Sequence, residues 1–156
     1  MTDRYAVVGN PIQHSRSPRI HQLFAEQTGQ DMSYDAILIE PGNFRRDVEA
    51  FFQQRGKGLN VTLPFKTEAW EFAGRLSPQA REAGAVNTLS LEADGLVSGH
   101  NTDGVGLVRD LTQRLNLKLE GIRILVLGAG GAVRGVLGPL LAQQPEQMVV
   151  CNRTRS

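Results

Sequence analysis

Lys66 is the residue whose type and setting best suit catalysis. It ends the segment Gly58–Lys66, GLNVTLPFK, in which apolar residues alternate with Asn60 and Thr62. This alternation is typical of a strand that sends its amide and hydroxyl groups to one face. Pro64 fits the first turn of a helix, so we expect Lys66 in the opening turn of a helix that follows this strand. A lysine at the positive end of a helix dipole is suited to proton transfer, although a solvated surface lysine is the simpler interpretation of this segment alone.

Two serines lie in the loop after an apolar strand predicted at 5–9. Ser17 and Pro18 are typical of a helix start, with the serine as cap and the proline at the first helical position, and Gly29 is a natural stop. Ser15 lies two residues before Ser17. Capping and turn chemistry explains Ser17 completely and Ser15 partly, so by themselves they indicate no ligand.

Polar side chains also flank a hairpin predicted at 86–98. An Asp-Gly pair at 94–95 is a strong tight-turn signal between its two strands. Asn87 lies near the start of the hairpin, and Asp103 follows its end, directly before a helix predicted at 104–116. Either Asp103 or Thr102 would cap this helix, and the simplest interpretation of Asp103 is such a capping carboxylate.

The elements that must position these side chains alternate in type. A strand at 34–39 and an amphipathic helix from Phe44, which ends at Gly56, separate the first strand from the strand before Lys66. The aromatic residues of that helix are expected to be core residues. The order of strands and helices predicts a mainly parallel α/β sheet with right-handed crossovers. Ligands of such sheets bind at the carboxyl ends of the strands, where the serine loop and Lys66 would meet.

A glycine-rich turn follows a later strand. A buried strand is predicted at 122–127. It runs into GAGGAVRG, which leads into a helix at 133–143 and a strand at 147–151. Glycines between a strand and a helix let a pyrophosphate approach the backbone and the helix N-terminus. Gly128 and Gly130 fit this fingerprint, but a valine occupies the third glycine position. The pattern predicts a dinucleotide-binding unit.

The segment after that unit indicates which dinucleotide binds. CNRTRS has no carboxylate to bind the ribose 2′-hydroxyl of NAD, and it places Arg153 and Arg155 where they would meet a 2′-phosphate. NADP is therefore the expected cofactor. A basic exposed loop is the alternative interpretation.

Composition argues against several classes of protein. The 156 residues carry a formal net charge of +1, and this balance argues against a nucleic-acid binder, which would need a basic face. The single cysteine, Cys151, excludes an internal disulfide framework and fits a reducing compartment. The sequence has no signal region and no apolar run of the about 18 residues that a membrane span needs. The cytoplasm is therefore the expected location. The three histidines, His14, His21 and His100, are scattered, so no metal site is expected.

Six motifs together suggest a family. GNPIQHSRSP, NVTLPFK, AVNT, NTDG, GAGGAVRG and CNRT occur in this order along the whole chain. The set resembles the shikimate dehydrogenase family, whose members reduce 3-dehydroshikimate with NADPH. The resemblance implies an α/β substrate domain over 1–103, a connecting helix and linker over 104–118, and the first strand–helix–strand unit of a Rossmann domain over 119–156.

The resemblance also implies roles for individual residues. Ser15 and Ser17 would bind the substrate carboxylate, and the ring hydroxyls would be held by Asn60, Thr62, Asn87 and Asp103. Lys66 would contact the substrate and act as the catalytic acid/base, with Asp103 as its partner. The pyrophosphate would lie over Gly128, Ala129, Gly130, Gly131 and Ala132, and the adenosine phosphate would meet Asn152, Arg153 and Thr154.

The chain departs from the family pattern in length. It stops after the second Rossmann strand, whereas a complete dinucleotide fold needs on the order of 100 further residues. We therefore expect an N-terminal fragment that is poorly active or inactive and that self-associates through apolar surfaces. A quinate/shikimate dehydrogenase of broader specificity and a non-catalytic shikimate-binding module are the alternatives.

Overall fold

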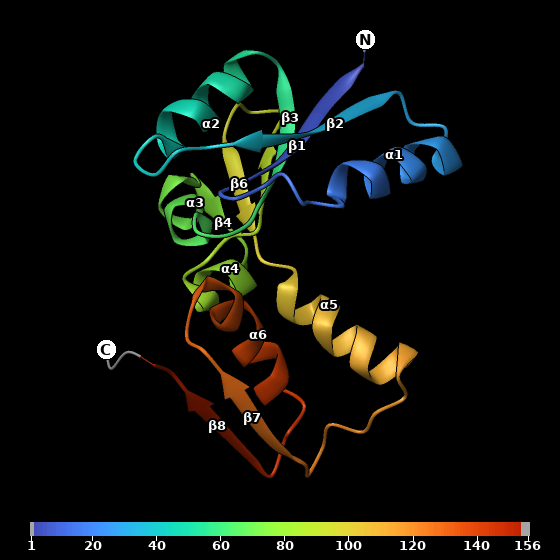
Figure 1. Ribbon diagram of the computed structural model, residues 1–156, viewed down its shortest axis with the longest axis vertical. Coiled ribbons are helices and arrows are strands. Elements are labelled where there is room, and N and C mark those ends of the chain that lie inside the picture. The colour runs from blue at the N-terminus through green and yellow to red at the C-terminus, as the bar shows by residue number, and fades with distance from the viewer. Residues whose placement is uncertain (1, 154–156) are drawn as a thin grey trace.

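The computed structural model describes residues 2–153, which form two α/β units connected through α5 (Figure 1). The first unit carries a six-stranded sheet in the order β2-β1-β3-β5-β6-β4, and the second a two-stranded sheet, β7-β8. The strands are β1 Asp3–Gly9, β2 Met32–Leu38, β3 Gly56–Val61, β4 Arg75–Leu76, β5 Thr88–Leu91, β6 Val97–His100, β7 Arg123–Leu127 and β8 Gln147–Cys151. The helices are α1 Ser17–Thr28, α2 Phe44–Gln53, α3 Lys66–Phe72, α4 Pro78–Ala83, α5 Asp103–Arg109 and α6 Gly131–Leu141.

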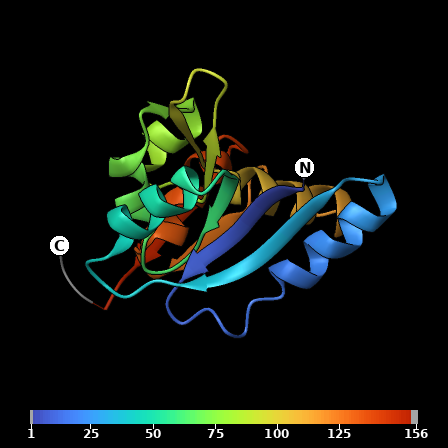
Figure 2. The ribbon, with the colours of Figure 1, turned by 90° about the horizontal axis from the view of Figure 1, so that it is seen from above.

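The pairing of the large sheet confirms the predicted fold class. β1 pairs in parallel with β2 on one side and with β3 on the other, and α1 and α2 form the crossovers. β5 and β6 form the predicted hairpin, which adds antiparallel to β3. β4 pairs in parallel with β6 and was not predicted, because two residues are too few to show a periodic pattern. Seen from above, α1 lies alongside β2 at one side of the sheet (Figure 2).

The aromatic residues of α2 are core residues, as predicted. Phe44 and Phe51 are buried together with Val48, and Phe44 stacks on Phe65 with ring centroids 5.3 Å apart. Burying an aromatic side chain of this size contributes about 1.5–3 kcal/mol. Because Phe65 directly precedes Lys66, this cluster fixes the start of α3 and with it the position of the lysine.

Two predictions near β3 are wrong. Gly56 begins β3 and does not end α2, since Arg55 makes the left-handed turn with a φ of 67°. A Cβ at Gly56 would lie 2.1 Å from the Phe51 ring, so close packing explains why a glycine occurs there. Pro64, which follows a cis peptide bond, lies in the turn before α3, and the helix begins at Lys66 itself.

Neither Ser17 nor Asp103 is a helix cap. Ser17 is the first residue of α1, whose N-cap is Arg16, and Asp103 is the first residue of α5, whose N-cap is Thr102. Gly29 ends α1 in the left-handed conformation, as predicted. The side chain of Ser17 contacts Tyr34 of β2 instead, and that of Asp103 contacts Lys66 of α3.

The apolar side of α1 does not enter the core. Ile20 and Phe24 are 43% and 54% exposed, and β7 likewise leaves Leu125 and Leu127 exposed. Hydrophobic periodicity therefore predicted these elements but not their packing partners. Within residues 2–153, no helix has both the length and the apolar character that crossing a bilayer requires.

The second unit has the predicted order. β7 and β8 pair in parallel, and α6 connects them while packing against α4 and α5. α5 ends at Arg109 and continues as a π-helical turn, Asp110–Arg114, so the regular helix is shorter than the predicted 104–116.

Candidate active site

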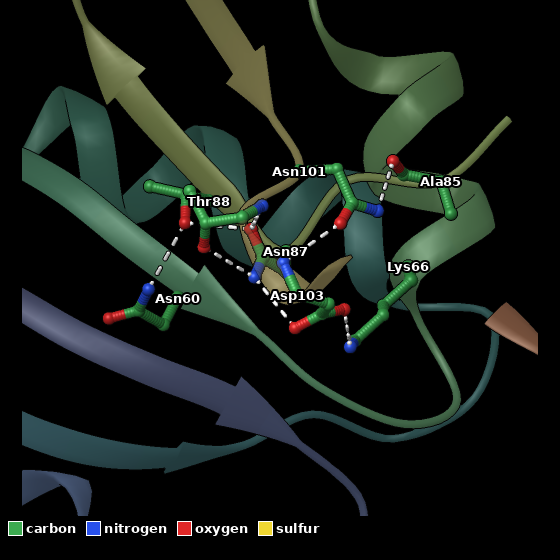
Figure 3. A network of polar contacts seen from close by, with 8 residues as sticks. Asn60, Lys66, Ala85, Asn87, Thr88, Asn101 and Asp103 are labelled. Carbon is green, nitrogen blue, oxygen red and sulfur yellow. Dashed lines mark hydrogen bonds and ion pairs between the residues drawn. The ribbon is translucent and has the colours of Figure 1, made fainter. Parts of the chain in front are cut away.

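Lys66 and Asp103 form an ion pair beside the large sheet. Lys66 begins α3 shortly after β3, and Asp103 begins α5 shortly after β6. Lys66 Nζ lies 2.5 Å from Asp103 Oδ2, and the two side chains are 13% and 26% exposed (Figure 3). Limited solvent contact makes such a pair stronger than an exposed surface pair. The structure therefore brings together the two residues that were predicted to act in catalysis.

Asn87 binds the second oxygen of the same carboxylate. Its Nδ2 donates to Asp103 Oδ1 at 2.9 Å and to Thr102 Oγ1 at 2.9 Å. Its Oδ1 accepts from the backbone N–H of Thr102 at 3.2 Å. Because Asp103 accepts from Lys66 on one oxygen and from Asn87 on the other, the plane of its carboxylate is fixed.

The polar network continues across the sheet from Asn87. Thr88 Oγ1 donates to Asn87 Oδ1 at 3.0 Å and accepts from Asn60 Nδ2 at 3.2 Å (Figure 3). Asn60 Oδ1 accepts from the Tyr34 hydroxyl at 2.6 Å. A hollow of about 370 Å³ is lined in part by Tyr34, Asn60 and Thr88. Side chains from β2, β3 and β5 thus form one hydrogen-bonded series that ends at the ion pair.

The two serines lie at the far end of this series. The Ser17 hydroxyl hydrogen-bonds the Tyr34 phenol, and Ser15 Oγ accepts from the Ser17 backbone N–H at 3.3 Å. His21, one turn further along α1, stacks on the Tyr34 ring with centroids 4.0 Å apart. The structure therefore places Ser17 in the network and Ser15 next to it.

Thr62 is held at the edge of the site by β1. Its backbone N–H donates to Val8 O at 2.9 Å, and its carbonyl accepts from Phe65 N at 3.0 Å. Gly9 leaves room for the Thr62 methyl group, since a Cβ at Gly9 would lie 2.5 Å from Thr62 Cγ2. Thr62 lies directly after β3, at the carboxyl end of the strand. Within residues 2–153, the hydrogen bonds described for Thr62 involve its backbone and not its hydroxyl.

Sequence reasoning missed three residues of the site. Tyr34 and Thr88 were interpreted only as strand residues, because aromatic and β-branched side chains are common in strands. Asn101 is 5% exposed, and it donates to Ala85 O at 3.0 Å and accepts from Asp103 N at 3.1 Å. The NTDG motif contained a signal for Asn101, since an amide two residues before a helical carboxylate can bond the backbone at that helix start.

Tyr34 is a neutral hydrogen-bond donor at ordinary pH. Burial raises the pKa of its phenol to about 12, and the hydrogen bond from Ser17 opposes that rise only in part. The proton between Tyr34 and Asn60 is therefore carried by the phenol, which donates it to the amide oxygen.

The glycine-rich turn at the start of α6 fits a pyrophosphate. Gly128 has a φ of 111°, which favours glycine, and its N–H donates to Cys151 O at 2.7 Å. A Cβ at Gly130 would meet nothing within 4 Å, so the approach to the first turn of α6 is open. That turn contains no acidic residue, and Arg153 is exposed after β8. These features suit a dinucleotide phosphate. Thr154 and Arg155, which were also predicted to contact the adenosine phosphate, lie outside the described residues.

α6 packs directly against the polar network. A Cβ at Gly131 would lie 3.2 Å from Lys66 Cβ, and one at Gly135 would lie 2.7 Å from Asn101 Oδ1. Gly104 makes the closest approach, since a Cβ there would lie 2.4 Å from Gly135 O. Glycines at these positions therefore allow the glycine-rich turn to lie next to the ion pair.

The fold and the site define an α/β protein with a partly buried lysine–aspartate ion pair. This pair lies next to a strand, a glycine-rich turn and a helix of the kind that binds dinucleotides. No group of three or more His, Cys, Asp or Glu residues in the described range could hold a metal ion. Residues 7–89 match the family described as the shikimate dehydrogenase substrate binding domain. The chain belongs to this family.

Similar proteins agree with this assignment. The chain is 58% identical over 154 residues to a protein of Alkalilimnicola ehrlichii named shikimate dehydrogenase (NADP(+)), with 99% of this chain and 57% of that protein covered. Crystal structures of shikimate dehydrogenase from Aquifex aeolicus and of shikimate 5-dehydrogenase from Thermus thermophilus, the latter in complex with NADP(H) and shikimate, have TM-scores of 0.91 and 0.88. Each is 36% identical to this chain, and each match covers 98% of this chain. The match covers 56% of the Aquifex aeolicus chain and 57% of the Thermus thermophilus chain. The chain thus spans about half the length of the curated relatives it matches.

Proposed function

We propose that this chain supplies the substrate site and the first cofactor-binding unit of an NADP-dependent shikimate dehydrogenase, which reduces 3-dehydroshikimate to shikimate. The observation that carries the proposal is the Lys66–Asp103 pair, held by Asn87 and adjoining the start of α6. The names of the similar proteins support both the reaction class and the cofactor. The proposed division is a substrate domain over 1–103, a connection over 104–118 and a nucleotide-binding unit over 119–156.

Lys66 is the general acid of the proposed reaction. Its ammonium donates a proton to the ketone oxygen as that oxygen becomes a hydroxyl, and oxidation of shikimate reverses the transfer. Asp103 orients the ammonium through the 2.5 Å contact and accepts from the neighbouring substrate hydroxyl. NADPH, when bound, supplies the hydride.

The polar network supplies the groups that a polyhydroxylated acid requires. Ser15 and Ser17 bind the carboxylate in this proposal, and Asn60, Thr62 and Asn87 bind ring hydroxyls together with Asp103. Amides and hydroxyls both donate and accept hydrogen bonds. These side chains can therefore exchange a bond to a neighbouring side chain for a bond to a hydroxyl group of the ligand.

The start of α6 binds the cofactor phosphates in this proposal. Backbone N–H groups of the turn from Gly128 to Ala132 face the pyrophosphate, and Asn152 and Arg153 contact the adenosine phosphate together with Thr154. The exposed Arg153 and the lack of an acidic residue in the first turn of α6 support a phosphorylated dinucleotide.

Two measurements test the proposal. An isotope-labelled sample of the chain is titrated with shikimate, and we expect chemical-shift changes at Ser15, Thr62, Lys66 and Asp103. Turnover with shikimate and NADP is then compared with that of Lys66→Met, which we expect to lower the rate by about 10²-fold or more while shikimate binds within a few-fold of the original affinity. A well-dispersed spectrum that shikimate leaves unchanged would refute the substrate assignment.

The same measurements, extended by a titration with NADP, separate the alternatives. Shikimate binding by the unaltered chain together with no binding of NADP would favour a non-catalytic shikimate-binding module. Equal turnover of quinate and shikimate would favour a quinate/shikimate dehydrogenase of broader specificity. Turnover that survives in Lys66→Met would remove the lysine from the mechanism.

A further inference from the structure

We propose that Tyr34 is a positioning residue that links the two sides of the substrate site, by orienting the Asn60 amide while it holds Ser17. This inference deepens the proposed function and rests on it. Tyr34 belongs to β2, Asn60 to β3 and Ser17 to α1, so a single side chain connects three elements.

The Tyr34 hydroxyl reaches across one strand of the sheet. β1 lies between β2 and β3, and Tyr34 is paired with Tyr5 of β1. The phenol nevertheless approaches Asn60 Oδ1 to 2.6 Å. Asn60 is thereby held by a partner from two strands away as well as by its own strand.

The hydrogen bonds from Tyr34 onward all run in one direction. Tyr34 donates to Asn60, Asn60 donates to Thr88, and Thr88 donates to Asn87. Asn87 in turn donates to Asp103, whose ionised carboxylate can only accept. A donor at the first position and an acceptor at the last leave one consistent assignment for every group between them.

The effect of Tyr34 is concentrated on Asn60. Asn87 has a second, independent constraint, because the backbone N–H of Thr102 donates to its Oδ1. Among the side-chain bonds of the described residues, the Asn60 amide is held only by Tyr34, at its oxygen, and by Thr88, at its nitrogen. The single Thr88 proton goes to Asn87, so Thr88 accepts from Asn60 and keeps the nitrogen on its side. Without the phenol donor, the Asn60 amide keeps only the bond to Thr88, so its oxygen lacks a donor and its plane is free to tilt away from the ligand.

The ring of Tyr34 is fixed separately from its hydroxyl. His21 stacks on it at a centroid distance of 4.0 Å and an interplanar angle of 9°, and the His21 ring Nδ1 lies 2.9 Å from Ser17 O. Tyr34→Phe therefore removes the donor and keeps the stack. The phenol also stays protonated throughout the neutral range, because burial raises its pKa to about 12.

The test compares shikimate titrations of the unaltered chain, Tyr34→Phe and Tyr5→Phe. We expect Tyr34→Phe to weaken shikimate binding about three- to tenfold, the effect of one hydrogen bond, and to shift the Asn60 side-chain amide resonance. Tyr5→Phe is the matched control on the adjacent strand, and it should leave both unchanged. In an active form of the enzyme, KM should rise while kcat stays within about twofold, since Asn87 and Lys66 keep their constraints.

Each outcome decides one of the two proposals. No shikimate binding by the unaltered chain would refute the proposed function. Binding by the unaltered chain that Tyr34→Phe matches, with the Asn60 amide unmoved, would overturn the role of Tyr34 and leave the proposed function intact. Should Tyr34→Phe lose its folded spectrum, Asn60→Ala provides the reciprocal readout without ligand: the ring resonances of Tyr34 should move and those of Tyr5 should not, and unmoved Tyr34 resonances would likewise overturn the inference.

Discussion

Gly135→Ala tests whether the nucleotide-binding unit fixes the position of Asp103 through Asn101. The new methyl group would lie 2.7 Å from Asn101 Oδ1 and 2.8 Å from Nδ2. Asn101 is buried and bonded to Ala85 O and to Asp103 N, so it cannot move away without weakening a bond. We therefore expect the variant to disturb the start of α5 although it lies in α6.

The magnitude follows from three contributions to the free energy of unfolding. Replacing glycine by alanine inside a helix stabilises by about 0.5–1 kcal/mol. Overpacking of a close contact costs about 1–3 kcal/mol, and a buried amide that loses a partner costs about 1–3 kcal/mol more. Gly135→Ala should therefore be less stable than the unaltered chain by about 1–5 kcal/mol. This loss lowers Tm by roughly 2–4 °C per kcal/mol at this size.

Gly106→Ala in α5 is the matched control. A Cβ at Gly106 would meet nothing within 4 Å, so this variant should gain the helical stabilisation of about 0.5–1 kcal/mol without a clash. The assay is thermal unfolding of both variants by circular dichroism, followed by shikimate titration of Gly135→Ala, which should bind more weakly. Equal stabilisation by both substitutions would refute the argument, since it would mean that α6 does not press on Asn101.

Three further predictions concern the site. Asp103→Asn removes the charge that orients Lys66 and should lower turnover by about 10²-fold or more, measured as NADP reduction in the presence of shikimate; a smaller loss than about tenfold would contradict the proposed pairing. Cys151 is exposed, and its carbonyl accepts from Gly128 in the glycine-rich turn, so NADP should slow the reaction of its thiol with a chromogenic disulfide, whereas an unchanged rate would argue against phosphate binding there. Tyrosinate absorbance should show a step near pH 12 that Tyr34→Phe removes, because burial raises the pKa of Tyr34 to about 12; the contribution of Tyr34 to stability is then fully present below about pH 10 and is lost as pH rises through 12, and the absence of a step near 12 would refute this.

The sequence predicted those parts of the fold that local patterns determine. Apolar runs such as the one before Gly9, and the turn signal at 94–95, correctly located strands of both sheets. The prediction that aromatic residues such as Phe44 form the core was also confirmed. These features succeed because the burial of a strand or a helix face is repeated along several neighbouring residues.

The sequence could not predict features that depend on contacts between distant elements. Local patterns alone interpreted Asp103 as a cap, because its neighbours in the sequence offer backbone groups. Its pairing with Lys66, 37 residues away, was predicted only by the family resemblance. Tyr34 was overlooked for a similar reason, since its partner Asn60 is 26 residues away. α1 shows the opposite error: its periodicity was evident, but Phe24 is exposed because a pattern specifies a face and not its neighbour.

The order of the network along the chain bears on how the protein is synthesised. Its hydrogen-bonded side chains run from Ser17 to Asp103, and all six strands of the large sheet also precede Asp103. Domains fold as units, with the N-terminal part first during synthesis at about 5–20 residues per second. The substrate site can therefore assemble on the ribosome some seconds before Gly135 emerges, and the second unit then docks onto a site whose hydrogen bonds already exist.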